Sequence, residues 1–367
     1  MKIGYWAPLP PAPSGVADYA AELLRALRQH AQVSVNAPGD VDLYHIGNNS
    51  LHRRIYERAL AYPGVVILHD AVLHHFLLGA LEQAEYVSEF RYNYGAWAEQ
   101  TAGELWAARS RSAADPRFFR YPMLRRLAER SRAILVHNPA AATLVRDHSP
   151  AARVAIVRHL HVPEEPAAPF AITRLRADMG VLPHELLFGV FGYLRESKRI
   201  AAVLRAFTVA RRVVPVRLLV AGDFVSATWE RAISPLLRAA GVIRRPHLDQ
   251  RAFLLHASAV DACINLRYPS AGETSGIKVR LMGLGKPVIL TDSPENDDPP
   301  DTCLRVSAGL AEEEELAAQM VAVASRPRDA RQIGSNAAAW IRREHDPDRA
   351  AIACYHECSI ASPAVQR

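Results

Sequence analysis

Residues 261–292 read DACINLRYPSAGETSGIKVRLMGLGKPVILTD, and this stretch decides the fold. Its first apolar run, 262–266, fits a buried parallel strand, which a loop containing Pro269 and Gly272 ends. Thr274 or Ser275 can cap a helix that Gly285 terminates, and a second apolar run, 288–290, follows. The order strand, loop, helix, strand predicts a βαβ unit of a doubly wound α/β protein.

The start of this helix is a candidate ligand site. A helix that begins just past the carboxyl end of a parallel strand offers backbone N–H groups and the positive end of its dipole. Glu273 would repel a simple anion there, but it suits a ligand that carries both a phosphate and sugar hydroxyls, such as a nucleotide sugar. An ordinary βαβ unit with a tight glycine turn would explain Gly285 and Pro287, but it would not explain Glu273 followed by two hydroxyl residues.

The same residues carry a family resemblance. The run LRYPSAGETSG at 266–276, followed by GKPVILTD at 285–292, resembles the donor-site block of bacterial family 4 (group 1) retaining glycosyltransferases. The resemblance implies the GT-B fold, an α/β architecture of two Rossmann-like domains whose parallel sheets face a central cleft. It also implies a C-terminal helix that crosses back onto the first domain.

Length and punctuation agree with two domains. At 367 residues the chain exceeds what one core usually supports. The first half alternates short apolar runs with helical segments, and a proline-rich stretch at 162–169 reads as a linker. We therefore expect an acceptor-side domain at 1–165, a donor domain at 175–345, and a helix at 346–367 that packs on the first domain.

Residues 83–132 hold nine of the 27 aromatic residues, interleaved with arginines. Such a segment suits an acceptor groove or a membrane-surface patch. It also suits a helical insertion into the first domain that packs on its own aromatic side chains, and we favour this last interpretation.

Composition excludes several classes. The formal net charge is +6, without a run of like charges that would indicate nucleic-acid binding. No apolar run approaches the ~20 residues needed to span a bilayer, and no signal peptide is recognisable, so we expect a cytoplasmic protein, with peripheral contact to the inner membrane face as a further hypothesis. The four scattered cysteines match no common zinc pattern.

Candidate residues in the first half follow predicted strands. Gly15 lies in the loop after the first strand, at the ligand-facing edge of such sheets, although it can equally serve only the turn. Asn48 follows another strand and can belong to a plain turn. His69 and Asp70 end the strand at 65–69, where Asp70 can instead cap the next helix. In the resembled family a histidine at this strand end faces the donor hexose, a role that we assign to His69.

The second domain opens with a glycine-containing strand at 187–194 and a basic segment. Its order resembles the family segment in which an arginine and a lysine neutralise the donor diphosphate. Lys198 matches that lysine. Tyr193 stands where the family has arginine after Gly192, so Arg195 is the candidate substitute.

The resemblance gives further site residues their specific roles. It implies that Glu273 holds hexose hydroxyls and that the amides of Thr274, Ser275 and Gly276 bind the sugar-phosphate. Arg267 is assigned to the donor site with them. Asp298, where the family usually has glutamate, is a weaker candidate.

One position departs from the family. Many members carry a second glutamate eight residues after the first, at the nucleotide ribose; counting back from Gly285 places Arg280 there, and Glu273 is displaced by one residue. Loss of that carboxylate removes an acceptor for the ribose hydroxyls, so the resemblance does not identify the nucleotide of the donor.

The sequence thus predicts a hexosyltransferase that retains anomeric configuration. It moves a sugar from a nucleotide-diphosphate sugar, its co-substrate, to an acceptor hydroxyl. The acceptor is a glycan, a lipid-linked saccharide or a small molecule, as in polysaccharide biosynthesis. The resemblance implies no metal or other cofactor, because Lys198, Arg195 and the helix dipole can stabilise the leaving diphosphate. The alternatives are a nucleotide-sugar epimerase of the same fold and a non-catalytic GT-B scaffold that partners an active enzyme.

Overall fold

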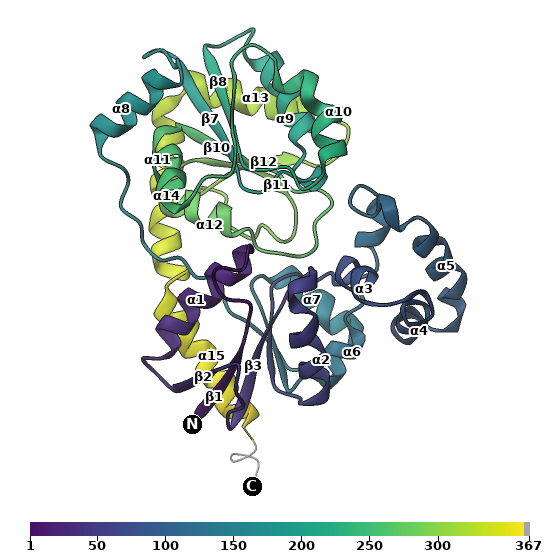
Figure 1. Ribbon diagram of the computed structural model, residues 1–367. Coiled ribbons are helices and arrows are strands. Elements are labelled where there is room, and N and C mark those ends of the chain that lie inside the picture. The colour runs from purple at the N-terminus through teal and green to yellow at the C-terminus, as the bar shows by residue number, and fades with distance from the viewer. Residues whose placement is uncertain (363–367) are drawn as a thin grey trace. The chain divides into compact units, whose positions relative to one another are not determined.

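A computed structural model describes residues 1–362 of the chain, which form two compact units. Unit 1 comprises Met1–Val162, Pro269–Thr274 and the segment from His345 onward; unit 2 comprises Pro163–Tyr268 and Ser275–Glu344. Both units are α/β, with parallel strands at their centre and helices on both faces of the sheet (Figure 1). The last residues of the predicted terminal segment, 363–367, lie outside the described residues.

The sheet of unit 1 is entirely parallel and has the order β2-β1-β3-β4-β5-β6. Its central strands are buried and strongly apolar, as strands covered on both faces must be. The order reverses between β1 and β3, so the carboxyl ends of these strands form a topological switch point. The strands are β1 Lys2–Trp6, β2 Gln32–Val35, β3 Val41–Ile46, β4 Val65–Leu68, β5 Ala133–Val136 and β6 Val154–Ile156.

Helices cover both faces of this sheet. On one face, the core includes Tyr19 and Leu23 of α1 and Cys354 and Cys358 of α15. The other face packs against α2, α6 and α7, as Figure 1 shows. The bounds are α1 Gly15–Leu27, α2 Arg53–Ala61, α3 His74–Ala80, α4 Gln83–Tyr94, α5 Glu99–Ala107, α6 Arg125–Arg130, α7 Pro139–His148 and α15 Pro347–Ala361, with short 3-10 turns η1 Ser50–His52, η2 Ala96–Ala98, η3 Arg109–Arg111 and η4 Pro116–Phe119.

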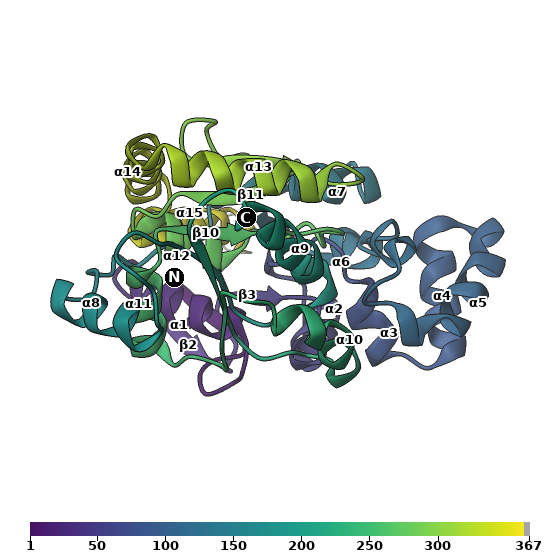
Figure 2. The same ribbon diagram turned by 90° about the horizontal axis from the view of Figure 1, so that it is seen from above.

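The aromatic-rich segment 83–132 is helical. Helices α4 and α5 lie side by side beyond α3 (Figures 1 and 2). Their aromatic rings pack against one another: Phe90 lies 4.7 Å from Tyr94 and 5.0 Å from Tyr121, and Tyr86 lies 5.3 Å from Trp106, measured between ring centroids. The segment therefore has its own aromatic core, which supports the packing interpretation.

Unit 2 has the strand order β12-β11-β10-β7-β8-β9. When β7 is counted as the first strand and the sheet is followed from β9, this is the dinucleotide-binding order 3-2-1-4-5-6. Its strands are β7 Leu186–Phe191, β8 Val216–Ala221, β9 Val242–Arg245, β10 Ala262–Asn265, β11 Val288–Asp292 and β12 Leu304–Ser307. Its helices are α8 Pro169–Asp178, η5 Glu196–Lys198, α9 Ile200–Ala210, α10 Ala227–Leu237, α11 Gln250–Ala259, α12 Gly276–Gly283, α13 Glu312–Ser325 and α14 Pro327–Glu344.

The two faces of this second sheet carry separate cores. Helices α9 and α13 pack on one face, and α11, α12 and α14 pack on the other. Among the described residues, no helix combines the length and the apolar character that crossing a bilayer requires.

Candidate functional site

The carboxyl ends of β7 and β10 form the switch point of the unit 2 sheet. The two strands pair directly, and the strand order runs away from them in opposite directions. Ligands of open α/β sheets bind in the crevice outside such a point. The segment after β7 contains Gly192, Arg195 and Lys198, and the segment after β10 contains Arg267 and leads to α12. The unit 2 residues predicted for the donor site therefore follow the two strands at which a ligand is expected.

Lys198 is buried at this edge, with 6 % of its surface exposed. Its ammonium group donates a hydrogen bond to the carbonyl of Phe191, the last residue of β7. A side chain at Gly192 would bring its Cβ to 3.0 Å from Lys198 Nζ, and the φ of Gly192 is +85°. Glycine at 192 thus lets the backbone turn while leaving room for the ammonium group.

The neighbouring basic residues behave differently. Arg195 is exposed. Arg199 adopts a left-handed conformation, φ +58°, at the start of α9, and its Nη2 lies 2.7 Å from Glu312 Oε2. Arg199 therefore already has a buried carboxylate partner, and Lys198 and Arg195 are the basic residues of this segment that the sequence predicts for the donor site.

Ser275 caps α12, and Thr274 does not. Ser275 Oγ accepts from the backbone N–H of Lys278 at 3.3 Å and from Asn265 Nδ2 at 2.9 Å. Arg267 Nη2 lies 3.4 Å from the same oxygen. These bonds tie the first turn of α12 to the end of β10 and orient the N–H groups of Ser275 and Gly276, which no intrahelical bond uses.

The loop Pro269–Thr274 belongs to unit 1. Ala271 accepts a hydrogen bond from Val72 N at 2.9 Å, and Asn138 Nδ2 donates to Gly272 O and Thr274 Oγ1, both at 3.1 Å. Gly272 has φ +73°, and a Cβ there would lie 2.7 Å from Ala71 Cβ. Only glycine fits this approach without strain.

Within this loop, the carboxylate of Glu273 folds back on its own backbone. Glu273 Oε2 accepts from Ala271 N at 2.8 Å and from Ser270 Oγ at 3.3 Å. The side chain is half-buried. The carboxylate that the sequence predicts for the sugar therefore accepts two hydrogen bonds within its own loop.

Arg280, at the position of the missing glutamate, has its own carboxylate partner. Its Nη2 lies 2.8 Å from Glu164 Oε1, and its guanidinium carbon lies 4.0 Å from the centre of the Phe253 ring. Glu164 also lines a cavity of about 310 Å³ with residues 283–285, at the C-terminal end of α12, and with Arg342. A carboxylate from the 162–169 stretch thus accompanies the arginine on α12.

Asp298, the weaker candidate, is buried in an ion pair. Its Oδ2 lies 2.7 Å from Lys278 Nζ, and Lys278 Nζ also donates to Asn296 Oδ1 at 3.3 Å. The pair joins α12 to the loop after β11.

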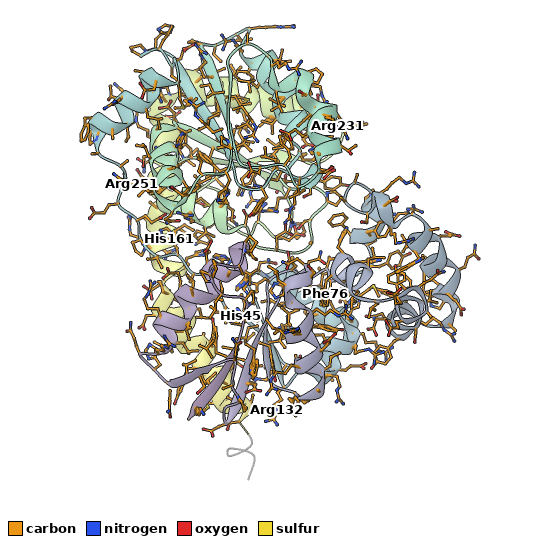
Figure 3. The ribbon with its side chains drawn as sticks, viewed as in Figure 1. His45, Phe76, Arg132, His161, Arg231 and Arg251 are labelled. Carbon is orange, nitrogen blue, oxygen red and sulfur yellow. The ribbon has the colours of Figure 1, made fainter. Side chains whose placement is uncertain are left out.

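In unit 1, three histidines from neighbouring strands are hydrogen-bonded in series. His45 Nδ1 lies 3.0 Å from His69 Nε2, and His69 Nδ1 lies 3.1 Å from His137 Nε2. His137 Nδ1 lies 2.8 Å from the carbonyl oxygen of Val157. Both ring nitrogens of His69 are therefore engaged by other imidazoles. Figure 3 shows His45 on its strand, β3.

The sheet explains this alignment. His45 lies on β3, and His69 and His137 each lie one residue past the end of β4 and β5. Parallel pairing places Leu68 opposite Val136, so that His69 and His137 come next to each other. Side chains of a strand point alternately to its two faces, and all three histidines fall on the face of the sheet that packs on α1. Tyr19 of α1 lies 4.9 Å from His69 and 5.0 Å from His137, centroid to centroid.

Burial keeps these rings uncharged. It lowers the pKa of both His137 and His52 to about 4. His52 joins this group because its Nδ1 lies 2.9 Å from the carbonyl oxygen of His45. Burial lowers the pKa of His45 and His69 well below the ordinary value, and the neighbouring imidazoles add to this effect.

The other unit 1 candidates have structural contacts. Asn48 Oδ1 accepts from Phe76 N at 2.8 Å in the first turn of α3, and Asn48 N donates to Asp70 Oδ2 at 2.8 Å. Gly15 is exposed and opens α1 behind the cap Ser14, and a Cβ there would meet nothing within 4 Å. Asn48 and Asp70 thus hold the strand ends and α3, and Gly15 meets no steric requirement for glycine.

Sequence reasoning missed His45, His137 and Asn138. The signal was present, because Tyr-His-Ile, Leu-His-Asp and Val-His-Asn place a histidine at the end of three successive central strands. Within residues 1–362, no group of three or more His, Cys, Asp or Glu side chains is arranged to hold a metal ion.

No protein-family model matches this sequence, and no curated protein matches it either. Solved structures do match. HepE from Anabaena, in complex with UDP and glucose, has a TM-score of 0.65 at 15% sequence identity, over 98% of this chain and 99% of that one. Sucrose-phosphate synthase from Thermosynechococcus elongatus has a TM-score of 0.66 at 14% identity, over 97% of this chain and 98% of its own. WaaG, a glycosyltransferase involved in lipopolysaccharide biosynthesis, has a TM-score of 0.62 at 12% identity, over 96% and 98% of the two chains.

At these identities the likeness shows the fold. The two Rossmann-like units are those of the GT-B fold, and the predicted fold class is confirmed.

Proposed function

We propose that this protein is a glycosyltransferase that transfers a hexosyl unit from a nucleotide-diphosphate sugar to an acceptor hydroxyl. The observation that carries the proposal is the set of groups at the switch point of unit 2. A buried ammonium group, Lys198, lies at the end of β7, and the capped start of α12 follows the neighbouring strand β10. A diphosphate needs positive charge and backbone N–H donors together, which this edge offers.

Each candidate residue then has a chemical task. Lys198 and Arg195 neutralise the diphosphate, which is the leaving group, and the N–H groups of Ser275 and Gly276 bind the phosphate next to the sugar. Arg267 approaches the cap of α12 through Ser275 and adds a third cation. Glu273 binds hexose hydroxyls, for which its charged oxygens are strong acceptors. His69 is the unit 1 residue that we assign to the hexose.

We further propose that the reaction is metal-independent and retains configuration. The cations and the helix dipole stabilise the charge that develops on the leaving diphosphate. The acceptor attacks from the face that the diphosphate leaves, and the leaving phosphate oxygen accepts the proton of the acceptor hydroxyl. The C–O bond to the diphosphate breaks while the C–O bond to the acceptor forms.

Support for a nucleotide-sugar donor comes from the fold neighbours, since HepE was crystallised with UDP and with UDP-glucose. The test is a thermal-shift screen against UDP-, GDP-, dTDP- and ADP-sugars, each with and without EDTA. Ligand that binds only the folded state raises the melting temperature by mass action. We expect a rise with one nucleotide family that EDTA does not change. A rise that EDTA abolishes would contradict metal independence.

A second candidate is a non-catalytic GT-B scaffold. Arg280, paired with Glu164, is the observation that favours it, because a guanidinium replaces the carboxylate that binds ribose in the resembled family. Release of free nucleotide from the donor, with or without acceptor, separates the two. A folded protein that binds no nucleotide sugar and releases none would support the scaffold.

A further inference from the structure

The hydrogen-bonded series of histidines in unit 1 has a direction. A carbonyl oxygen only accepts, so the contact of His137 Nδ1 with Val157 O requires a proton on Nδ1. A neutral imidazole carries one N–H, and His137 Nε2 must then accept from His69 Nδ1. His69 Nε2 is left as an acceptor for His45 Nδ1–H. One backbone carbonyl thereby fixes the tautomer of three side chains.

This assignment requires that the rings be neutral, and their surroundings keep them so. His45, His69 and His137 are 0 %, 7 % and 3 % exposed. The titratable side chains beside them include the rings of Tyr5 on β1 and Tyr19 on α1, together with His52 and His159. None of these groups is an acid that ionises below neutral pH, and burial alone disfavours an imidazolium.

The far end of the series agrees with the same direction. His45 Nε2 is buried and has no hydrogen-bond partner within the described part of the chain. The reverse direction would leave an unpaired N–H group at His45 Nε2, which is more costly to bury than an unpaired acceptor nitrogen. It would also place the lone pair of His137 Nδ1 against the lone pairs of Val157 O.

We propose that His45 and His137 are positioning residues, which occupy both ring nitrogens of His69 and hold it as the Nδ1–H tautomer, so that His69 presents only its ring edge to a bound sugar and exchanges no proton with it. The part of this inference that concerns the sugar rests on the proposed function. The tautomer does not, because it follows from the unit 1 contacts alone.

The first experiment observes the tautomers directly. Protein labelled with ¹⁵N-histidine is studied without ligand at pH 7.5 by long-range ¹H–¹⁵N correlation, and the signals are assigned with single substitutions. We expect His45, His69 and His137 to be Nδ1–H tautomers with unprotonated Nε2. An Nε2–H or doubly protonated His69 would overturn the inference, and this outcome is independent of any enzymatic activity.

The second experiment tests positioning during turnover, measured as nucleotide release from the donor that binds. H45L removes the donor to His69 Nε2, whereas H45N keeps an amide N–H near the place of Nδ1–H. We expect H45L to lower kcat roughly 10-fold, as loss of a supporting residue often does, with the donor KM within about 3-fold of wild type, and H45N to recover most of the loss.

Wild-type kcat in a folded H45L would overturn the positioning role. If H45L does not fold, the pair H137L and H137Q replaces it, because Gln keeps an oxygen that accepts from His69 Nδ1–H. If no donor binds to wild type, the proposed function fails, and the spectra still decide the tautomer.

Discussion

Lys278 Nζ and Asp298 Oδ2 form an ion pair of 2.7 Å in which the two side chains are 2 % and 0 % exposed. Lys278 extends from α12, the helix whose first turn is part of the proposed donor site, and Asp298 extends from the loop after β11. The pair therefore joins the first turn of α12, in which the backbone N–H of Lys278 also donates to the cap Ser275, to the loop after β11. Asp298 thus contacts α12 through Lys278, and its carboxylate already has a buried cation as its partner.

Removal of one partner should destabilise the protein strongly. Lys278→Met leaves the Asp298 carboxylate buried without its cation, and we expect a loss of about 3–5 kcal/mol in the free energy of unfolding. The double substitution Lys278→Met with Asp298→Leu removes both charges and should recover most of that loss. Urea unfolding measures both variants. Equal destabilisation by the single and double variants would contradict the argument.

Lys198→Met should weaken donor binding while the fold persists. We expect the affinity for the nucleotide sugar to fall roughly 10- to 100-fold, as for loss of a hydrogen bond to a charged group. Arg205→Met on α9, the helix that follows Lys198, is the matched control, since Arg205 pairs with Glu313 at the surface. Titration calorimetry compares the two, and similar losses in both would remove Lys198 from the site.

Glu273→Gln should separate sugar binding from nucleotide binding. The amide oxygen of Gln can still accept from Ala271 N, so the loop keeps its shape. If Glu273 binds hexose hydroxyls, the thermal shift with the nucleotide sugar should shrink while the shift with the free nucleoside diphosphate is unchanged. If Glu273 only holds the loop, the two shifts should change together.

Acid should destabilise unit 1 before the carboxylates titrate. The buried histidines have folded-state pKa values below the unfolded value of about 6.5, so the unfolded chain binds more protons and stability falls as pH drops below about 6.5. His52 and His137, with pKa values of about 4, should together cost about 4 kcal/mol at pH 5 relative to pH 7.5.

The measurement is the free energy of unfolding in urea between pH 5 and pH 7.5. His52→Asn should reduce the slope of stability against pH, because one buried imidazole is lost. His356→Gln, at an exposed position of α15, should leave the slope as it is. A slope that is identical in all three proteins would show that these buried rings do not govern it.

The sequence predicts the central strands well because they are continuous apolar runs. β7 and β10 extend to within a few residues of the prediction. The edge strands β9 and β12 were not predicted, since they are short and half-buried and the sequence VIRR of β9 contains two arginines. An edge strand pairs with one neighbour only and is less completely covered than a central strand, so its sequence need not be uniformly apolar.

For the candidate site, local spacing predicts what one loop or one helix arranges. The cap at Ser275 and the glycine at 285, with φ +74°, are of this kind. The imidazole series is not, because His45, His69 and His137 are far apart in the sequence and meet only through the register of β3, β4 and β5. The partner of Arg280 was equally invisible, since Glu164 comes from a stretch more than a hundred residues earlier in the chain.

The division of the chain between the units has a consequence for the order of folding during synthesis. Unit 2 is complete once Glu344 has left the ribosome. Within its span of the sequence, only the six residues of Pro269–Thr274 belong to unit 1. Unit 1 still lacks α15, whose Cys354 and Cys358 are part of its core. The half that begins at the N-terminus is therefore the half that finishes second, and a released chain truncated after residue 344 should contain a protease-resistant unit 2 and a protease-sensitive unit 1.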